Sequence, residues 1–352
     1  MNNNAIQQID HWNNVQNKPI KTIFVCEFIT SGGLNDSDLP SGLLAQGLGM
    51  RDALLHDLSD LPYEVITTVD VRVTLPTDCH TCYLVDADDD VWGVWEEIVG
   101  SVDAVWLVAP ETGGDLSKLT ALALAYNKCI LGCGLTAVNT CSSKLATYAL
   151  LQQADVNTMA TYQYDLWPKT KGVAWLAKPD DGAGCEETVV FDSALLLEQW
   201  LLKKNYTKTH VIQPYLQGAA GSIACVMNKG AAYLLSCNKQ LIKKENNELS
   251  YKGCLVNGMQ QYWIEFAALA NQVAQLLPDL RGYVGIDVIV GNGGGGEIVV
   301  VEINPRLTTS YMALKEATGY NPAELLMKTL TQPGYEWPTI QHHEVMVEFA
   351  HA

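Results

Sequence analysis

The first 135 residues alternate between strand-like and helix-like segments, and this alternation limits the chain to few folds. Strand patterns occur at 21–30, 63–70, 103–110 and 129–134, and helix patterns occur at 43–58, 91–100 and 115–128. Parallel strands need long crossover connections, which are usually helices. The alternation therefore predicts a small parallel sheet that is covered by helices.

Beyond about residue 137 the pattern changes to strands mixed with fewer helices. A helix is predicted at 140–156, with Ser142 or Ser143 as its N-cap. Further strands are predicted at 173–180, 187–192, 209–218, 222–228, 231–242, 283–290 and 297–304, and further helices at 193–204 and 264–280. This mixture is typical of α+β units, so the fold class predicted for the whole chain is α/β followed by α+β.

Composition excludes several classes of protein. A chain of 352 residues is too long for one ordinary core, so two or three folded units are expected. The net charge of −17 disfavours nucleic-acid binding, which needs a basic surface. No run of about 18 apolar residues indicates a membrane span. The polar N-terminus lacks the apolar centre of a signal peptide, so residues 1–18 are predicted to be a flexible leader of a cytoplasmic protein.

Ten cysteines are scattered among apolar runs, which favours reduced thiols in a cytoplasmic protein. Cys79 and Cys82 form a C-x-x-C pattern that could hold a structural metal. A second ligand pair is missing nearby, so ordinary thiols are the simpler interpretation.

The segments 283–290 and 297–304 are predicted to form a hairpin through a flexible glycine-rich turn at 291–297. Each strand carries an isolated acid among apolar residues, Asp287 on the first and Glu302 on the second. Alternation along a strand places Glu302 and Asn304 on one face. Such oxygen ligands suit Mg²⁺. The alternative is that Glu302 only leaves the sheet edge and pairs with Arg306.

Two lysines and a glycine loop add phosphate-binding potential. Lys178 ends an apolar strand and precedes a loop with Gly182 and Gly184, whose backbone N–H groups can approach phosphate closely. Lys144 lies in the first turn of the predicted helix at 140–156. Each also has a simple structural reading, Lys144 as a solvated lysine and the loop as an ordinary turn.

The order of Lys144, Lys178 with its glycine loop, "VIQPYLQG", Asp287 and "EINPR" resembles the ATP-grasp superfamily over about residues 137–310. Within it, "CEFITSGGL", "SSKLATYALL" and "EINPRLTTSYMALKEATGYNPAELL" look most like the ATP-grasp proteins of methanofuran-type cofactor biosynthesis, whose type enzyme is tyramine–L-glutamate ligase. The resemblance implies a Rossmann-like N-terminal domain at 19–136, followed by two ATP-grasp subdomains at 137–212 and 213–352.

The resemblance also implies roles for individual residues. Contacts to ATP are implied for Lys144, Lys178, Asp181, Gly182, Ala183, Gly184, Gln213, Tyr215 and Lys239, with Gln213 and Tyr215 at the adenine hinge. Mg²⁺ or Mn²⁺ would be held by Asp287, Glu302 and Asn304. Arg306 and Lys178 would act on the transferred phosphoryl group. Two departures from the family pattern affect the nucleotide: no acid stands near Ala220 to bind ribose, and Cys185 occupies a position where a second loop glycine is common.

The implied activity is an ATP-dependent carboxylate–amine ligase that works through an acyl-phosphate, with glutamate as the carboxylate and tyramine or tyrosine as the amine. It would serve one-carbon carrier biosynthesis, and a homodimer is expected. Another ATP-grasp ligase, for amino acids or a glutamate tail, is the first alternative. A nucleotide-binding regulatory protein with a degenerate site is the second. Thr308, Thr309 and Ser310 either cap the following helix or contact the acceptor.

Overall fold

The structure is a computed structural model that describes residues 19–291 and 296–349. The expected flexible leader at 1–18, and the centre of the glycine-rich turn, lie outside the described residues. The first sheet has the order β3-β2-β1-β4-β5 and every neighbouring pair is parallel, as the alternating pattern predicted. Its strands are β1 (Thr22–Glu27), β2 (Glu64–Asp70), β3 (Thr81–Val85), β4 (Ala104–Val108) and β5 (Cys129–Ile130).

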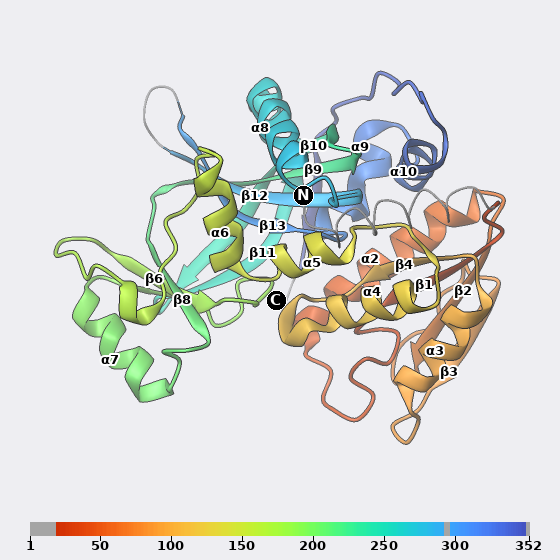
Figure 1. Cartoon of the computed structure of the whole chain (residues 1–352), viewed down its shortest axis with the longest axis horizontal. Coiled ribbons are helices and arrows are strands. Elements are labelled where there is room, and N and C mark those ends of the chain that lie inside the picture. The colour runs from red at the N-terminus through yellow and green to blue at the C-terminus, as the bar shows by residue number, and fades with distance from the viewer. Residues whose placement is uncertain (1–18, 292–295, 350–352) are drawn as a thin grey trace.

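Helices cover both faces of this sheet (Figure 1). They are α2 (Ser41–Ser59), α3 (Val91–Ser101) and α4 (Asp115–Ala125). Successive side chains of β1 point to opposite faces. Ile23 therefore packs into one core cluster with Leu54 of α2, and Phe24 packs into another with Trp95 of α3. Burial on both faces explains why β1 reads as an unbroken apolar run.

The second sheet has the order β13-β12-β9-β10-β11-β7-β6-β8, and β14 pairs with β11 off this path. Its strands are β6 (Trp175–Pro179), β7 (Val189–Phe191), β8 (His210–Pro214), β9 (Gly218–Asn228), β10 (Ala231–Glu245), β11 (Glu248–Val256), β12 (Gly282–Gly291), β13 (Ile298–Asn304) and β14 (Val345–Glu348). The predicted hairpin is confirmed, because β12 and β13 pair antiparallel.

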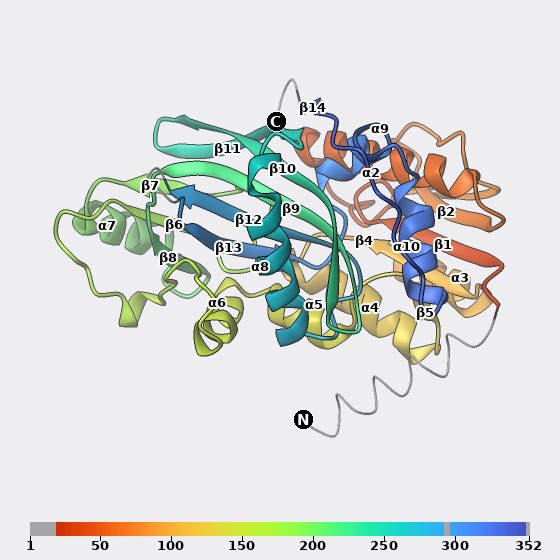
Figure 2. The ribbon, with the colours of Figure 1, turned by 90° about the horizontal axis from the view of Figure 1, so that it is seen from above.

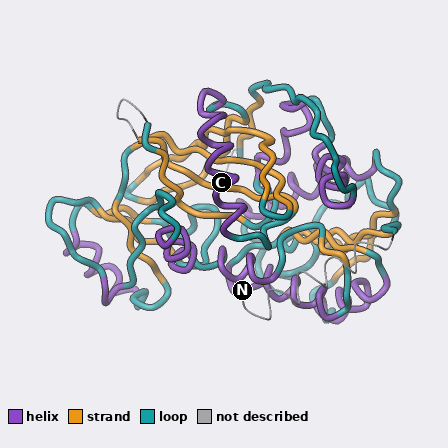
Figure 3. The backbone as a smooth tube through the Cα atoms, turned by 45° about the horizontal axis from the view of Figure 1, so that its top comes forward, coloured by secondary structure: helices purple, strands orange, loops and turns teal. Residues whose placement is uncertain are grey.

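The remaining helices are α5 (Leu135–Cys141), α6 (Lys144–Gln153), α7 (Ala194–Lys204), α8 (Trp263–Leu276), α9 (Leu314–Thr318) and α10 (Pro322–Thr331), with short 3-10 turns η1 (Thr112–Gly114), η2 (Tyr164–Leu166), η3 (Gln260–Tyr262) and η4 (Thr309–Ala313). Figures 1 and 2 show the two sheets side by side, and Figure 3 shows their strands in orange between the helices. Leu54 of α2, Leu326 of α10 and Tyr311 of η4 share one core cluster. The two units therefore share buried contacts, and these fix the end of β13 against the parallel sheet.

The structure departs from the expected elements at several places, and α10 and β14 are among the elements that were not expected. The predicted helix at 140–156 spans the end of α5 and all of α6, and Ser143 caps α6 by accepting a hydrogen bond from Ala146 N. Strand β3 was not expected, because it is a half-exposed edge strand with no clean alternation. Strand β11 was also missed, because Gly253 interrupts the run of strand-forming residues in its sequence. In the structure Gly253 has a φ of +135. Across the described residues, no helix combines the length and apolar character that crossing a bilayer requires.

Candidate active site

A cavity of about 510 Å³ lies between the two units and is lined by both. Its walls include almost every site residue named from the sequence. They are Lys144, Lys178, Gly182, Ala183, Gly184, Gln213, Tyr215, Lys239, Asp287, Glu302, Asn304 and Arg306. Asp181 does not line the cavity. Residues that are far apart in the chain therefore converge on one space large enough for a nucleotide.

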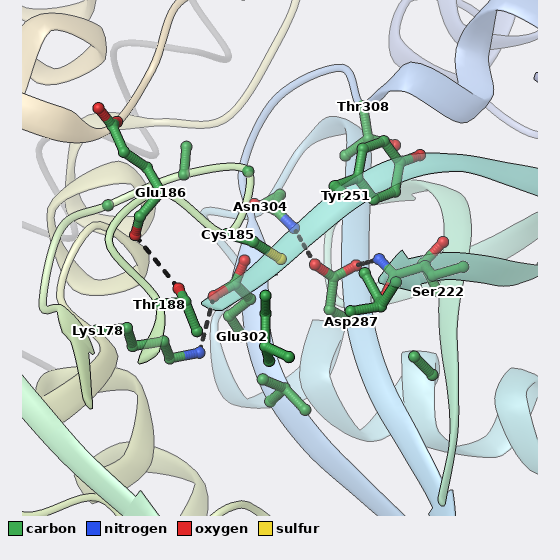
Figure 4. A pocket seen from close by; sticks show the side chains of 18 of the residues that line it. Lys178, Cys185, Glu186, Thr188, Ser222, Tyr251, Asp287, Glu302, Asn304 and Thr308 are labelled. Carbon is green, nitrogen blue, oxygen red and sulfur yellow. Dashed lines mark hydrogen bonds and ion pairs between the residues drawn. The ribbon is translucent and has the colours of Figure 1, made fainter. Parts of the chain in front are cut away.

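The hairpin brings the two acids and the amide together. Asp287 and Glu302 are directly paired across β12 and β13. Directly paired residues of antiparallel strands project from the same face. Asn304 lies two residues after Glu302, and its Nδ2 donates to Asp287 Oδ2 at 3.3 Å. Figure 4 shows these three side chains converging from the two strands.

Two buried lysines neutralise one of these carboxylates. Lys178 Nζ lies 3.3 Å from Glu302 Oε2, and Lys144 Nζ lies 3.7 Å from the same oxygen. Burial alone would raise the pKa of Glu302, but the two ammonium groups outweigh burial and hold that pKa near 2. Glu302 is therefore a carboxylate at neutral pH. The alternative in which it pairs with Arg306 is wrong.

The pKa of Asp287 is shifted in the opposite direction from that of Glu302. Burial, followed by the charge of Glu302, raises the pKa of Asp287 to about 8. Two buried carboxyl groups side by side cannot both ionise unless a further cation joins them. The pair therefore fits a divalent cation that binds through few protein groups and through substrate phosphates. No group of three or more His, Cys, Asp or Glu residues in the described part of the chain could hold a metal by itself, and this includes the surroundings of Cys79 and Cys82.

Lys144 of α6 contacts the glycine loop through its side chain. It is only 7% exposed, and its Nζ donates to Gly182 O at 2.6 Å. Desolvation by burial lowers the pKa of Lys144. The reading of Lys144 as a solvated helix lysine is therefore wrong. Cys185 has a φ of +65, a conformation that suits glycine better, which accounts for the glycine common at this position in the family pattern.

Asp181 joins the loop to the other unit instead of reaching the cavity. Its Oδ2 accepts from Gly113 N at 3.0 Å, and its carbonyl accepts from Thr112 Oγ1 at 3.1 Å. Thr112 and Gly113 belong to η1, just after β4. Asp181 therefore links the glycine loop to the turn that follows β4 of the parallel sheet.

The expected hinge residues lie at the end of β8. Gln213 is buried, and its Nε2 donates to Thr161 Oγ1 at 2.9 Å. The backbone N–H of Tyr215 already donates to Ala174 O at 2.8 Å. The Tyr215 ring lies 5.1 Å from the Lys244 ammonium, a cation–π contact.

The three hydroxyls after β13 do not cap a helix. Thr308 precedes η4 but makes no side-chain capping bond. Tyr283 Oη lies 2.7 Å from Thr308 Oγ1 and 3.0 Å from Ser310 Oγ, and Tyr251 Oη lies 2.6 Å from Thr309 Oγ1. All three hydroxyl residues line the cavity, so the capping alternative is wrong.

Three functional candidates were missed from the sequence. Gln240 Nε2 donates to Asp287 Oδ1 at 2.9 Å, Glu111 pairs with Arg306 at 2.7 Å, and Glu27 lines the cavity. Only Glu27 gave a local signal, because it is a single acid at the end of a strongly apolar strand. The partners of Gln240 and Glu111 lie too far away in the chain for any spacing rule.

Known proteins match this chain along most of its length. An ATP-grasp domain family matches residues 141–310, and a pre ATP-grasp 3 domain family matches residues 63–138. A tyramine–L-glutamate ligase of Methanocaldococcus fervens is 31% identical over 87% of this chain and 93% of its own length. The chain belongs to the ATP-grasp superfamily.

A second curated relative and a solved structure are also similar to this ATP-grasp protein. The tyramine–L-glutamate ligase of Methanocaldococcus jannaschii is 27% identical over 88% of this chain and 89% of its own length. The crystal structure of an ATP-grasp superfamily protein from Archaeoglobus fulgidus superposes with a TM-score of 0.65 at 21% identity, over 93% of this chain and all of that one. The chain thus has the ATP-grasp fold.

This ATP-grasp protein is an ATP-dependent ligase that forms carbon–nitrogen bonds. Its substrates are a small carboxylate and an amine, and the fold binds ATP with a divalent metal. The cavity brings lysines, an arginine, acids and an amide from both units into one space.

Proposed function

We propose that this ligase joins the γ-carboxyl group of L-glutamate to the amine of tyramine or tyrosine, in the biosynthesis of a methanofuran-type one-carbon carrier. The observation that carries this proposal is the 31% identity, over 87% of the chain, to a relative named tyramine–L-glutamate ligase. The cavity that holds the site residues is consistent with it, because its walls combine cations, acids and apolar side chains.

The reaction has two steps. A carboxylate is a poor electrophile, so its oxygen first takes the γ-phosphoryl group of ATP, which gives an acyl-phosphate and ADP. The amine then attacks the acyl carbon, phosphate leaves, and the amine loses a proton as the amide forms. The first step brings two anions together, so the site must neutralise both.

We assign the metal to Asp287, Glu302 and Asn304 and propose that it is Mg²⁺, with Mn²⁺ as a substitute. When bound, the metal supplies charge neutralisation for the ATP phosphates. Glu302 is already held as a carboxylate by Lys178 and Lys144. Asn304 and Gln240 fix both oxygens of Asp287 through hydrogen bonds.

The cations of the cavity would serve the phosphates. Lys144 and Lys178 neutralise phosphate charge from one side, and Lys239 lines the cavity from β10. The loop 182–184 supplies backbone N–H groups. Arg306 would stabilise the transferred phosphoryl group. Adenine would lie against Gln213 and Tyr215 at the end of β8.

The test is an ADP-release assay with purified full-length protein. Glutamate with tyramine or tyrosine, MgCl₂ and ATP should release ADP, and omission of any one component should stop it. The amide product should appear by mass spectrometry in equal amount. If other carboxylate–amine pairs release ADP but this pair does not, the substrate assignment is wrong. If no pair does, the ligase proposal itself falls.

We also propose that the enzyme acts in the cytoplasm. All ten cysteines lie in the described part of the chain and are free thiols, which suits a reducing compartment. Fractionation of the native host would test this assignment, and recovery in an exported fraction would contradict it.

A further inference from the structure

The cavity extends beyond the ATP-binding half to the end of the parallel sheet. In that sheet the chain runs from β1 to β2 and β3 on one side, while β4 and β5 lie on the other. The strand order therefore reverses between β1 and β4. In open α/β sheets, ligands bind in the crevice at the carboxyl ends of the strands at such a reversal. The last residues of β1 and β4, Glu27 and Val108, are paired in register and both line the cavity.

Glu27 is a buried carboxylate that is fixed in place but has no ionic partner. It is 3% exposed, and its Oε2 accepts from Thr30 N and from Thr30 Oγ1, both at 2.8 Å. No ion pair to Glu27 is found among residues 19–291 and 296–349. Arg51 acts on Glu27 only through space, because its guanidinium binds Asp52 and the Thr74 carbonyl. Burial raises the pKa of Glu27 and outweighs the opposing effects of its backbone and Thr30 hydrogen bonds and of the Arg51 charge.

A glycine keeps this carboxylate open to the cavity. A Cβ atom at Gly47 of α2 would lie 2.7 Å from Glu27 Oε2, so any side chain there would crowd the carboxylate. Gly47 and Glu27 both line the cavity. The residues from the same elements that line the cavity are mostly apolar, namely Ile29, Leu43, Met50, Ala109 and Pro110, with Gln46 as the polar exception. A buried acid that makes no ion pair, beside a largely apolar wall, suits a ligand with one cationic end and an apolar body.

We propose that Glu27 binds the primary ammonium group of a substrate, in a subsite at the junction of β1 and β4. This inference rests on the proposed function, since it gives the subsite to one of the two substrates. An ammonium would supply the missing counter-charge of Glu27, and the apolar wall would pack against an aliphatic or aromatic chain. The wall favours the amine substrate as the source of the ammonium over the α-amino group of glutamate.

The subsite at Glu27 lies next to the strand whose following residues contact Arg306. Glu111 follows Val108 by three residues and holds Arg306, which follows the metal strand β13. The carboxyl end of β4 therefore faces the phosphoryl-transfer residues, and β1 is its neighbour in the sheet. Glu27, Arg306 and Glu302 line the same cavity, so an amine bound at Glu27 shares one space with the site of the acyl-phosphate.

The test measures ligand binding, which does not require turnover. Tyramine, tyrosine, L-glutamate and other primary amines are titrated calorimetrically into full-length wild type and Glu27→Gln, both loaded with MgADP. Glutamine can still accept from Thr30, so the fold should persist, and thermal melts check this. The ligand that uses Glu27 should lose on the order of 10- to 100-fold in affinity, while ADP affinity stays within about twofold. 4-Ethylphenol, which lacks the ammonium of tyramine, should bind both proteins equally weakly.

Two further variants make the result interpretable. Gly47→Ala crowds the carboxylate without removing its charge and should weaken the same ligand. Asp70→Asn is the matched control, because Asp70 is a buried acid at the end of β2 that pairs with Arg72 outside the cavity; binding should not change. A selective loss for tyramine or tyrosine assigns the ammonium to the amine, and a selective loss for glutamate assigns it to the carboxylate substrate.

The inference is overturned if wild type binds none of these compounds, or if Glu27→Gln and Gly47→Ala bind each of them within twofold of wild type. Its failure is separate from failure of the proposed function. Wild type that binds a primary amine through Glu27 but releases no ADP from glutamate and tyramine would refute the substrate pair and leave the subsite standing.

Discussion

Arg306, two residues after β13, pairs with Glu111, three residues after the end of β4 in the other sheet. Its Nη2 lies 2.7 Å and its Nε 3.1 Å from the same Glu111 oxygen. Both side chains are largely buried, so the charge pair is poorly screened. This contact ties the proposed phosphoryl-transfer residue to the parallel sheet.

Glu111→Gln should lower kcat on the order of 10- to 100-fold and leave ATP affinity nearly unchanged. The amide keeps the shape but removes the charge that fixes the Arg306 guanidinium. Steady-state ADP release and ATP titration would separate the two effects. Glu97→Gln, an exposed acid on α3, is the control and should behave as wild type. An unchanged kcat in Glu111→Gln would show that Arg306 needs no positioning.

Glu302→Ala should abolish ADP formation, by on the order of 10³-fold or more, because it removes a proposed metal ligand and the partner of Lys144 and Lys178. The fold should persist, which circular dichroism can check. Excess MgCl₂ should not rescue the variant. Turnover close to that of wild type would remove Glu302 from the metal site.

Lys144→Met should weaken ATP binding on the order of 10- to 100-fold and loosen the glycine loop, since Lys144 Nζ holds the Gly182 carbonyl at 2.6 Å. Nucleotide titration and limited proteolysis near residues 182–186 would report the two effects. Lys118→Met serves as the control because Lys118 is an exposed lysine paired with Asp115 on α4. Equal protease resistance in both variants would contradict the role of Lys144 in the loop.

The stability of the ligand-free protein should depend on pH through Glu27. The pKa of this carboxyl is raised in the folded state, mainly by burial. The folded state therefore binds the proton more tightly than the unfolded chain. The stabilising contribution is complete below the unfolded pKa of about 4.5 and is lost as pH rises through the folded pKa.

Glu27→Gln does not titrate, so its stability relative to wild type should increase as pH rises from about 4.5 and then level off. Urea unfolding of both proteins at a series of pH values measures this difference. Asp70→Asn should show the opposite trend, because the pKa of Asp70 is lowered in the folded state. A constant difference between Glu27→Gln and wild type would contradict the raised pKa.

Short-range patterns in the sequence predicted a large part of this protein. The period of two in strands placed Glu302 and Asn304 on one face, and a short glycine-rich connection predicted that β12 and β13 would pair. Ser142 or Ser143 was predicted as an N-cap, and Ser143 caps α6, which places Lys144 in the first turn of that helix. These features depend on residues a few positions apart, whose relative geometry the backbone itself limits.

Partners across the two sheets were decided only by tertiary structure. Arg306 could have paired with Glu302 nearby, yet it pairs with Glu111, 195 residues away, and Glu302 takes Lys178 and Lys144 instead. The sequence holds many acids and bases and no local rule that matches them. Packing of the shared core between the two units selects the pairs, because burial penalises every charge left without a partner. The same packing places Glu27 at the cavity, where we propose that the ammonium of a substrate binds it.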